Sequence, residues 1–392
     1  MKYYISKIFF GLSCLFAFTI VLPFKENITS IISILLFICV LLDAILNKEN
    51  TFFKRSSFKI VAISVYLLFI IGLLYTSNLH DGLVQIQRKI AFIVFPVIYL
   101  SKPLSREQLI KVFWFLIVGI MVYITINWLA IYEMYHNDLV LRNRFGYNYV
   151  LHSYFRKTQF SIHHAYMGMY IIFALVICLY LIEHYKKLWI RIVLALIILI
   201  YLFNFPLIAS KVSFVTIVVA VMAYFVFKKS FHYKRFLLLI LPLVLVVSGM
   251  FILSNDWTEK LLLRSINERL ILWKVSIEVI RDNFWFGVGT GDVLDVLNTK
   301  YTNPDHHDYY SHNSFLLFFV RLGVLGVFSF LFYHFFLFKK AIKNNNILLF
   351  VLVIIALLSS LTEHVYERHI GIVFISFFFS ILFCSSNENI KS

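Results

Sequence analysis

Histidine and arginine side chains gather in one polar segment, residues 255–311, which is followed by His312-Asn313-Ser314. A neutral imidazole accepts a proton from a hydroxyl, and a guanidinium binds phosphate through two parallel hydrogen bonds. His312 therefore supplies a group that can activate a hydroxyl, whereas Arg269 taken alone is interpreted as a surface charge. The structural alternatives are an imidazole that only ends the loop at a helix, and an arginine that pairs with a neighbouring glutamate.

Two other features of this segment also suggest chemistry. Gly287–Gly291 has three glycines, but their spacing fits neither a dinucleotide-binding loop nor a nucleotide phosphate loop, so a structural turn is predicted. His306 and His307 are adjacent, and with His312 they fit no familiar zinc spacing. The sequence therefore predicts no metal and no other cofactor.

A helix is expected to position Arg269. Ser265-Ile266-Asn267-Glu268 has the spacing of a capping box, which predicts a helix from Ile266 to Arg281. Arg269 and Trp273 are four residues apart and share one face of this helix. Its predicted apolar face is formed by Leu270, Trp273, Ile277 and Ile280.

The rest of the chain has the composition of a membrane protein. Its 392 residues are 61% apolar and 14% charged, and long apolar runs recur throughout. Such runs form helices in a bilayer, so we predict an all-α polytopic protein forming a single integral membrane domain, 1–392. Twelve spans are predicted, at about 5–23, 29–46, 58–75, 84–100, 107–133, 162–183, 188–204, 207–227, 236–254, 312–338, 347–362 and 369–385.

Basic residues set the predicted orientation. More than half of the Lys and Arg residues lie in the links on the side of the two termini, which places both termini in the cytoplasm. This bias accounts for much of the net charge of +16, so nucleic acid is not a predicted partner. Loop 134–161 and the larger loop 255–311 then face outward, to the periplasm.

The first outer loop and the residues after it offer contacts for a glycan or for acceptor phosphate. These candidates are Arg142, Arg144, Arg156, His163 and His164, with Trp273 from the second loop. A solvated basic loop near anionic lipid is an equally good interpretation. A further outer cluster, Glu363 to His369, is interpreted as a local ion-pair network.

The order of several motifs resembles the O-antigen ligase and polymerase superfamily of bacterial membrane glycosyltransferases. The motifs are Glu268-Arg269-x-x-x-Trp273, then Phe286-Gly287-Val288-Gly289-Thr290-Gly291, then His312-Asn313-Ser314 followed by Leu322-Gly323-Val324-Leu325-Gly326. They precede the last spans, as in that superfamily. The resemblance is strongest over about residues 200–330, with a weaker echo from Arg88 to Pro96.

The resemblance implies a role for individual residues. His312 matches the histidine that activates the acceptor hydroxyl, and Arg269 matches an arginine that binds the diphosphate of the donor. Lys211, after Ser210, stands where the family has a second arginine; lysine keeps the charge but loses the two-pronged hydrogen bonding. Arg88 resembles a further basic position that binds the diphosphate.

These residues together predict a multi-pass enzyme of the bacterial inner membrane. It would transfer a polyprenyl-diphosphate-linked glycan en bloc to lipid A core on the periplasmic face, without metal or nucleotide. A polysaccharide polymerase is the nearest alternative, and a protein O-glycan ligase is the third. A lipid-linked glycan flippase or other transporter is the alternative from another class, although repeated halves and charges at mid-span are not evident.

Overall fold

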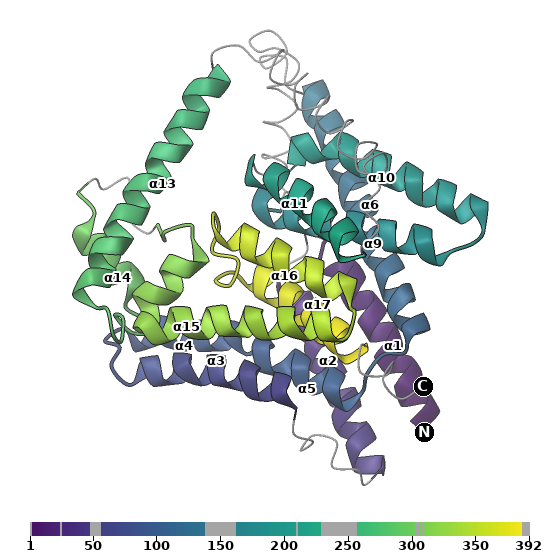
Figure 1. Cartoon of the computed structure of the whole chain (residues 1–392), viewed down its shortest axis with the longest axis horizontal. Coiled ribbons are helices and arrows are strands. Elements are labelled where there is room, and N and C mark those ends of the chain that lie inside the picture. Colours follow the sequence, from purple (N-terminus) through teal and green to yellow (C-terminus); the bar gives the residue numbers. More distant parts are fainter. Residues whose placement is uncertain are drawn as a thin grey trace. The chain divides into compact units, whose positions relative to one another are not determined.

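The structure is a computed structural model that describes residues 2–23, 26–47, 56–137, 162–208, 211–228, 257–302, 306 and 309–385. Within these ranges the chain forms helices, turns and loops, with no strand (Figure 1). The predicted all-α class is therefore confirmed. The helices are α1 (Lys2–Thr19), α2 (Glu26–Asn47), α3 (Ser57–Leu73), α4 (Leu79–Lys89), α5 (Ala91–Ser101), α6 (Arg106–Asn137), α9 (His164–His184), α10 (Leu188–Ile208), α11 (Lys211–Phe227), α13 (Trp257–Asp282), α14 (Val293–Lys300), α15 (Ser314–Lys343), α16 (Ile347–Ser360) and α17 (His369–Ser385).

Helices cover the predicted spans that fall in the described part of the chain, with 84–100 divided between α4 and α5, while the predicted span 236–254 lies outside it. Among the described residues, six stretches are long and apolar enough to cross a bilayer: Asn27–Leu46, Leu79–Ser101, Arg106–Glu133, His164–His184, Leu188–Phe205 and Ser314–Lys343. Four apolar helices are shorter. The chain is thus a multi-pass membrane protein, while the number of twelve spans and their orientation stay predictions.

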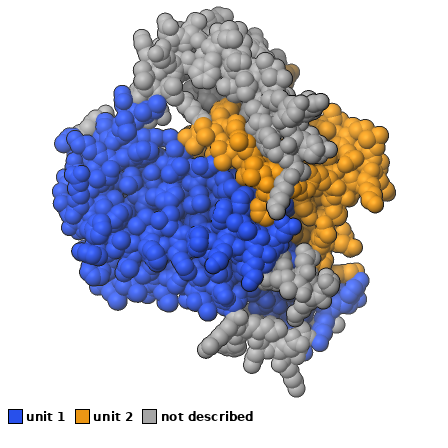
Figure 2. Space-filling model, in the orientation of Figure 1, with its two compact units in different colours: residues 1–6, 33–104, 261–392 blue, residues 7–32, 105–260 orange. Residues whose placement is uncertain are grey.

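The chain divides into two compact units, coloured blue and orange in Figure 2. Unit 1 comprises residues 1–6, 33–104 and 261–392, and unit 2 comprises residues 7–32 and 105–260. In unit 1, α3 packs against α5 and α15, and α17 packs against α5 and α16. In unit 2, α9 packs against α6, α10 and α11, as expected for a helix that is apolar on all sides. Whether the whole chain is a single membrane domain stays a prediction.

The helix that carries Arg269 is longer than the capping box predicts. It is α13, which begins at Trp257, so Ser265 lies inside the helix and is not its cap. The predicted apolar face is also wrong in part, since the side chains of Leu270 and Ile277 are 54% and 42% exposed. Tertiary packing selects another stripe of the helix. The buried side chains are Leu272, Val275, Val279 and Ile280, which join a cluster with α14 and α15.

The glycine-rich segment is the structural turn that the sequence predicts. Helix α15 breaks at Gly323, whose φ of 64° leaves the backbone groups around it without their usual helical partners. The turn supplies those partners: the N–H groups of Val288 and Gly289 donate to the carbonyls of Val320 and Arg321 at 2.9 and 3.0 Å. In a membrane helix such freed groups must be satisfied by neighbouring protein. The turn therefore determines how α15 continues past Arg321.

Gly287 offers a test of this arrangement. Its φ is 70°, and a Cβ atom placed on it would lie 2.5 Å from the carbonyl carbon of Arg321. We expect Gly287→Ala to lower the free energy of unfolding by roughly 1–3 kcal/mol, because strain and a steric clash add together. Thermal unfolding in detergent measures the change. Gly11→Ala in α1 is the control, since nothing lies within 4 Å of its added Cβ; equal melting temperatures for both variants and the parent would contradict the prediction.

Candidate functional site

His312 lies in the short segment between α14 and α15, in a left-handed backbone conformation with φ of 48°. A residue other than glycine pays roughly 1–2 kcal/mol for this conformation, so its neighbours must hold it there. On one side, the indole N–H of Trp273 donates to the carbonyl of Ser311 at 2.9 Å. On the other side, the side chain of Asn313 caps α15 by accepting from backbone N–H groups of its first turn. The imidazole is thus displayed by a fixed backbone.

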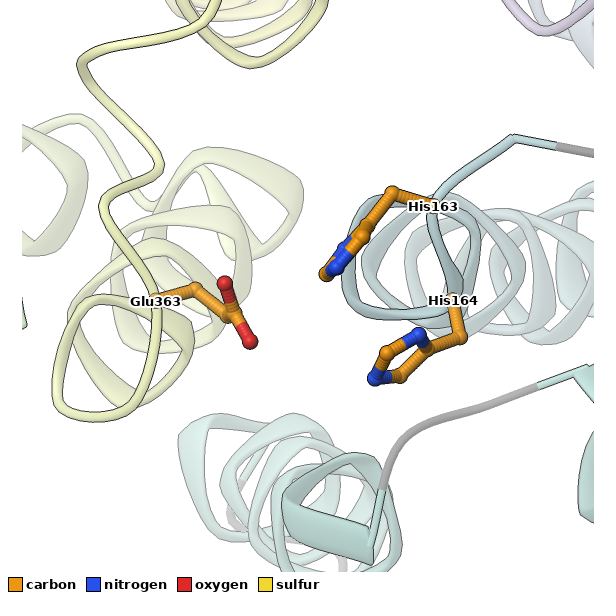
Figure 3. Close-up of side chains that lie close together, drawn as sticks. All are labelled: His163, His164 and Glu363. Carbon is orange, nitrogen blue, oxygen red and sulfur yellow. The ribbon is translucent and has the colours of Figure 1, made fainter. Parts of the chain in front are cut away.

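One carboxylate joins the two principal candidates. Glu363 lies in the link between α16 and α17 (Figure 3), and its side chain is 5% exposed. Its Oε2 is 3.3 Å from Nδ1 of His312, and its Oε1 is 3.4 Å from Nη2 of Arg269. The hydroxyl of Ser314 donates to the backbone carbonyl of Glu363 at 2.9 Å and fixes this part of the link to the start of α15.

The contact with Glu363 determines what the imidazole of His312 can do. When Nδ1 carries a proton and donates it to the carboxylate, Nε2 keeps its lone pair and can accept a proton from a hydroxyl. The same carboxylate orients Arg269, whose side chain remains 26% exposed and within reach of a ligand. The arrangement therefore places an imidazole that can accept a proton near a guanidinium that can bind an anion.

A second imidazole, that of His364, packs behind His312. The ring centroids of His312 and His364 are 4.9 Å apart, and the ring of Tyr310 is 5.6 Å from that of His364. Burial, together with the neighbouring His312, lowers the pKa of His364 to about 4. At neutral pH this ring is uncharged, so it adds no positive charge next to the candidate base.

His364 predicts how the stability of the fold depends on pH. Its pKa is lower in the folded chain than in the unfolded chain, so the unfolded state binds more protons between about pH 6.5 and pH 4. The contribution of His364 to the free energy of unfolding is fully present above pH 6.5. It is lost as the pH falls from 6.5 to 4, by about 3 kcal/mol in all. Denaturant unfolding in detergent at several pH values measures this loss. His364→Gln should flatten the curve, and parallel losses in parent and variant would contradict the assignment.

The donor atoms of His312, Glu363 and His364 lie within 4.8 Å of one another, a spacing that permits a shared metal ion. However, the guanidinium of Arg269 lies against the same carboxylate. A divalent cation on Glu363 would be repelled by this permanent positive charge. We therefore interpret the group as a base with its orienting carboxylate, and metal independence stays a prediction.

The cluster Glu363 to His369 is more than the local ion-pair network expected from the sequence. Glu363 contacts α13 and the segment before α15, as described above. Glu367 accepts from Arg321 of α15 at 2.7 Å twice, and from Lys89 of α4 at 3.1 Å. Both carboxylates thus bind residues that are far away in the sequence.

Arg88 lies in the same unit as these residues. It is exposed on α4, next to the buried Lys89. Burial raises the pKa of Tyr310 to about 12, and the nearby negative charge of Glu367 acts in the same direction, whereas the positive charges of Arg321 and Arg88 oppose it. Arg88 is therefore close enough to act on Tyr310, which is two residues before His312.

The remaining candidates belong to unit 2 or to stretches outside the described residues, and they are described by themselves. Lys211 is the first residue of α11 in unit 2, and its side chain is outside the described part. The predicted outer loop 134–161 falls outside it from residue 138 onward. His163 caps the start of α9 and His164 is its first residue, with ring centroids 4.3 Å apart (Figure 3). The loop arginines in the undescribed stretch are Arg142, Arg144 and Arg156.

Sequence reasoning missed the roles of Glu363 and of the buried pair formed by Glu367 and Arg321. One signal was present: Arg321 stands inside an otherwise apolar run, and a charge at such a position marks a functional or structural site. For Glu363 the only signal was its place in a short link on the same predicted side as His312.

Residues 196–331 match the family model described as O-antigen ligase. The match includes Arg269, Trp273, the glycine turn and His312, while Arg88 and Glu363 lie outside it. No curated protein matches the chain. The resemblance to the O-antigen ligase superfamily seen in the sequence is therefore confirmed over residues 196–331.

Proposed function

We propose that this protein transfers a glycan from a polyprenyl-diphosphate carrier, en bloc, to lipid A core on the periplasmic face of the bacterial inner membrane. The family match supports transfer of the ligase or polymerase type. The contact of one buried carboxylate with both His312 and Arg269 carries the proposal, because it combines a base with a phosphate-binding cation.

In the proposed reaction, Nε2 of His312 removes the proton from the acceptor hydroxyl. The hydroxyl oxygen attacks the anomeric carbon, and the bond from that carbon to the diphosphate oxygen breaks. The electron pair of this bond leaves with the diphosphate, which remains on its polyprenyl chain. A single displacement of this kind inverts the configuration at the anomeric carbon. No nucleotide is consumed, because the donor already carries its leaving group.

Arg269 would bind the diphosphate and stabilise the negative charge that grows on it in the transition state. Arg88 and Lys211 are proposed to bind the same group. Arg88 has the exposure that such a role needs, and its charge acts close to the loop that ends at His312. The glycan or acceptor contacts proposed for Arg142, Arg144, Arg156, His163, His164 and Trp273 belong to the same hypothesis.

Trp273 has a defined contact that bears on this hypothesis. Its indole N–H donates to the carbonyl of Ser311, so the residue helps to hold the backbone next to His312. Its partly buried ring leaves some surface for a sugar. A polysaccharide polymerase would use the same site with a growing glycan as acceptor, so the site geometry favours neither enzyme.

Reconstitution tests the proposal. The purified protein is placed in liposomes with a polyprenyl-diphosphate glycan and with lipid A core, without metal or nucleotide. Glycan attached to lipid A core supports the ligase, whereas a longer glycan on the carrier identifies a polymerase. If intact donor moves between leaflets and no glycan is transferred to either acceptor, the protein is a transporter and the proposed enzyme function is wrong.

A further inference from the structure

Three charged side chains, Lys89, Arg321 and Glu367, are buried together in unit 1, and we name them the Glu367 cluster. Their side chains are 0%, 2% and 3% exposed. Arg321 binds Glu367 through two hydrogen bonds of 2.7 Å, and Nζ of Lys89 donates to the same carboxylate at 3.1 Å and to Gln85 at 2.8 Å. Buried ion pairs contribute little net stability, because desolvation offsets their attraction. A reason other than stability is therefore needed for keeping this cluster.

The cluster joins three separate segments. Lys89 ends α4, Glu367 lies in the link between α16 and α17, and Arg321 lies two residues before the break of α15 at Gly323. The aromatic ring of Phe69 in α3 faces both cations, with ring centroid distances of 5.2 Å to Lys89 and 5.9 Å to Arg321. The glycine turn thus holds the backbone of Arg321, and the Phe69 ring of α3 packs against its guanidinium.

The link 361–368 carries both Glu363 and Glu367, and it is anchored at two points. Near Glu363, Asn313 and Ser314 donate to the carbonyls of Leu361 and Glu363 at 3.0 and 2.9 Å. Four residues later, the Glu367 cluster anchors the link to α4 and α15. The backbone N–H of Glu367 donates to the carbonyl of His364 at 2.9 Å, which makes the stretch between the two glutamates a compact turn.

We propose that Glu367 is a positioning residue for the reaction. Held by Arg321 and Lys89, it sets the position of the α16–α17 link and thereby keeps the Glu363 carboxylate against His312. This inference rests on the proposed function, because it assigns Glu367 an effect on the same general base. Displacement of Glu363 by about 1 Å is enough to reduce a reaction rate substantially.

Charge reversal tests the cluster. Glu367→Arg places three cations together, and Arg321→Glu places two carboxylates beside one lysine. In the double variant a carboxylate at position 321 again faces two cations, since Lys89 lies close to that position. We expect each single change to lower kcat at least about tenfold with the donor KM within about threefold of the parent, and the double variant to recover most of the loss. A double variant that folds but is no better than the single ones would overturn the proposal.

If the charge-reversal variants do not fold, the isosteric variant Glu367→Gln tests the positioning role. It should lower kcat at least about tenfold per folded enzyme, and an unchanged kcat would overturn the proposal. The matched control reverses the exposed pair formed by Lys300 and Asp282, whose side chains are 42% and 56% exposed, and it should leave kcat unchanged.

A chemical measurement separates this proposal from the proposed function. Diethyl pyrocarbonate modifies histidine, and its rate at His312 is followed by mass spectrometry whether or not the protein transfers glycan. Glu367→Gln should change this rate by at least about threefold, because the Glu363 partner of the imidazole moves. An unchanged rate would overturn the positioning role. Absence of glycan transfer in the parent would instead count against the proposed function alone.

Discussion

Replacement of His312 with Ala is expected to lower the rate of glycan transfer by roughly 100- to 10,000-fold, because it removes the proposed general base. Binding of the donor should change little, since the cations proposed to hold the diphosphate remain. The measurement is the initial rate of transfer in liposomes, normalised to the amount of folded protein. The loss should appear in kcat and leave the donor KM close to that of the parent.

His306→Ala is the matched control for this variant. His306 lies in the same polar segment as His312 but near Tyr301, with ring centroids 6.1 Å apart, and it is not part of the group around Glu363. We expect its transfer rate to equal that of the parent. If His312→Ala transfers glycan at the parental rate while its folded amount is unchanged, His312 is not the base and the proposed mechanism is wrong.

Glu363→Gln is expected to lower kcat roughly 100-fold, because an amide neither holds Nδ1–H as strongly nor stabilises the imidazolium that forms. The substitution preserves the size of the side chain, so the fold should be retained. Glu363→Asp keeps the charge at a shorter reach and should restore part of the rate. A loss caused only by structural damage would reduce the folded fraction of both variants alike.

A double-mutant cycle shows whether Glu363 acts through His312. In a background that already carries His312→Ala, Glu363→Gln should cost less than about threefold more, because the base that it orients is absent. Losses that multiply would mean that the two side chains act independently. Glu363→Gln can also raise the donor KM in the His312→Ala background. Such a change would report the second contact of Glu363, which is with Arg269.

The sequence by itself determined the class of the protein and the principal residues of the site. Apolar runs of bilayer length can only become helices in hydrocarbon, so each described span could be placed to within a few residues. The polar segment 255–311 stands out against such a background, and its residue types indicated acid–base chemistry at His312. The resemblance to the O-antigen ligase superfamily added phosphate binding at Arg269 as an expectation. The spacing of four residues also predicted correctly that Arg269 and Trp273 point to the same side, where they meet Glu363 and the carbonyl of Ser311.

The helix around Arg269 shows where local patterns become insufficient. A capping-box sequence predicts the start of a helix, but it does not prevent the helix from beginning earlier. Here α13 begins at Trp257 and continues through Ser265. Two apolar stripes were available on this helix, and contact with α14 and α15 selected the one that contains Leu272 and Val279. Propensity and periodicity rank such alternatives only weakly, because packing supplies most of the stability of a helix.

Only the tertiary structure revealed the carboxylates of the site. Glu363 is 51 residues from His312 and 94 residues from Arg269 in the chain, and no spacing rule connects positions so far apart. Their meeting is supported by hydrogen bonds between distant segments, in which Asn313 and Ser314 donate to the carbonyls of Leu361 and Glu363. The sequence therefore indicated the proposed base and the proposed phosphate-binding cation, whereas the carboxylate that contacts both follows from packing alone.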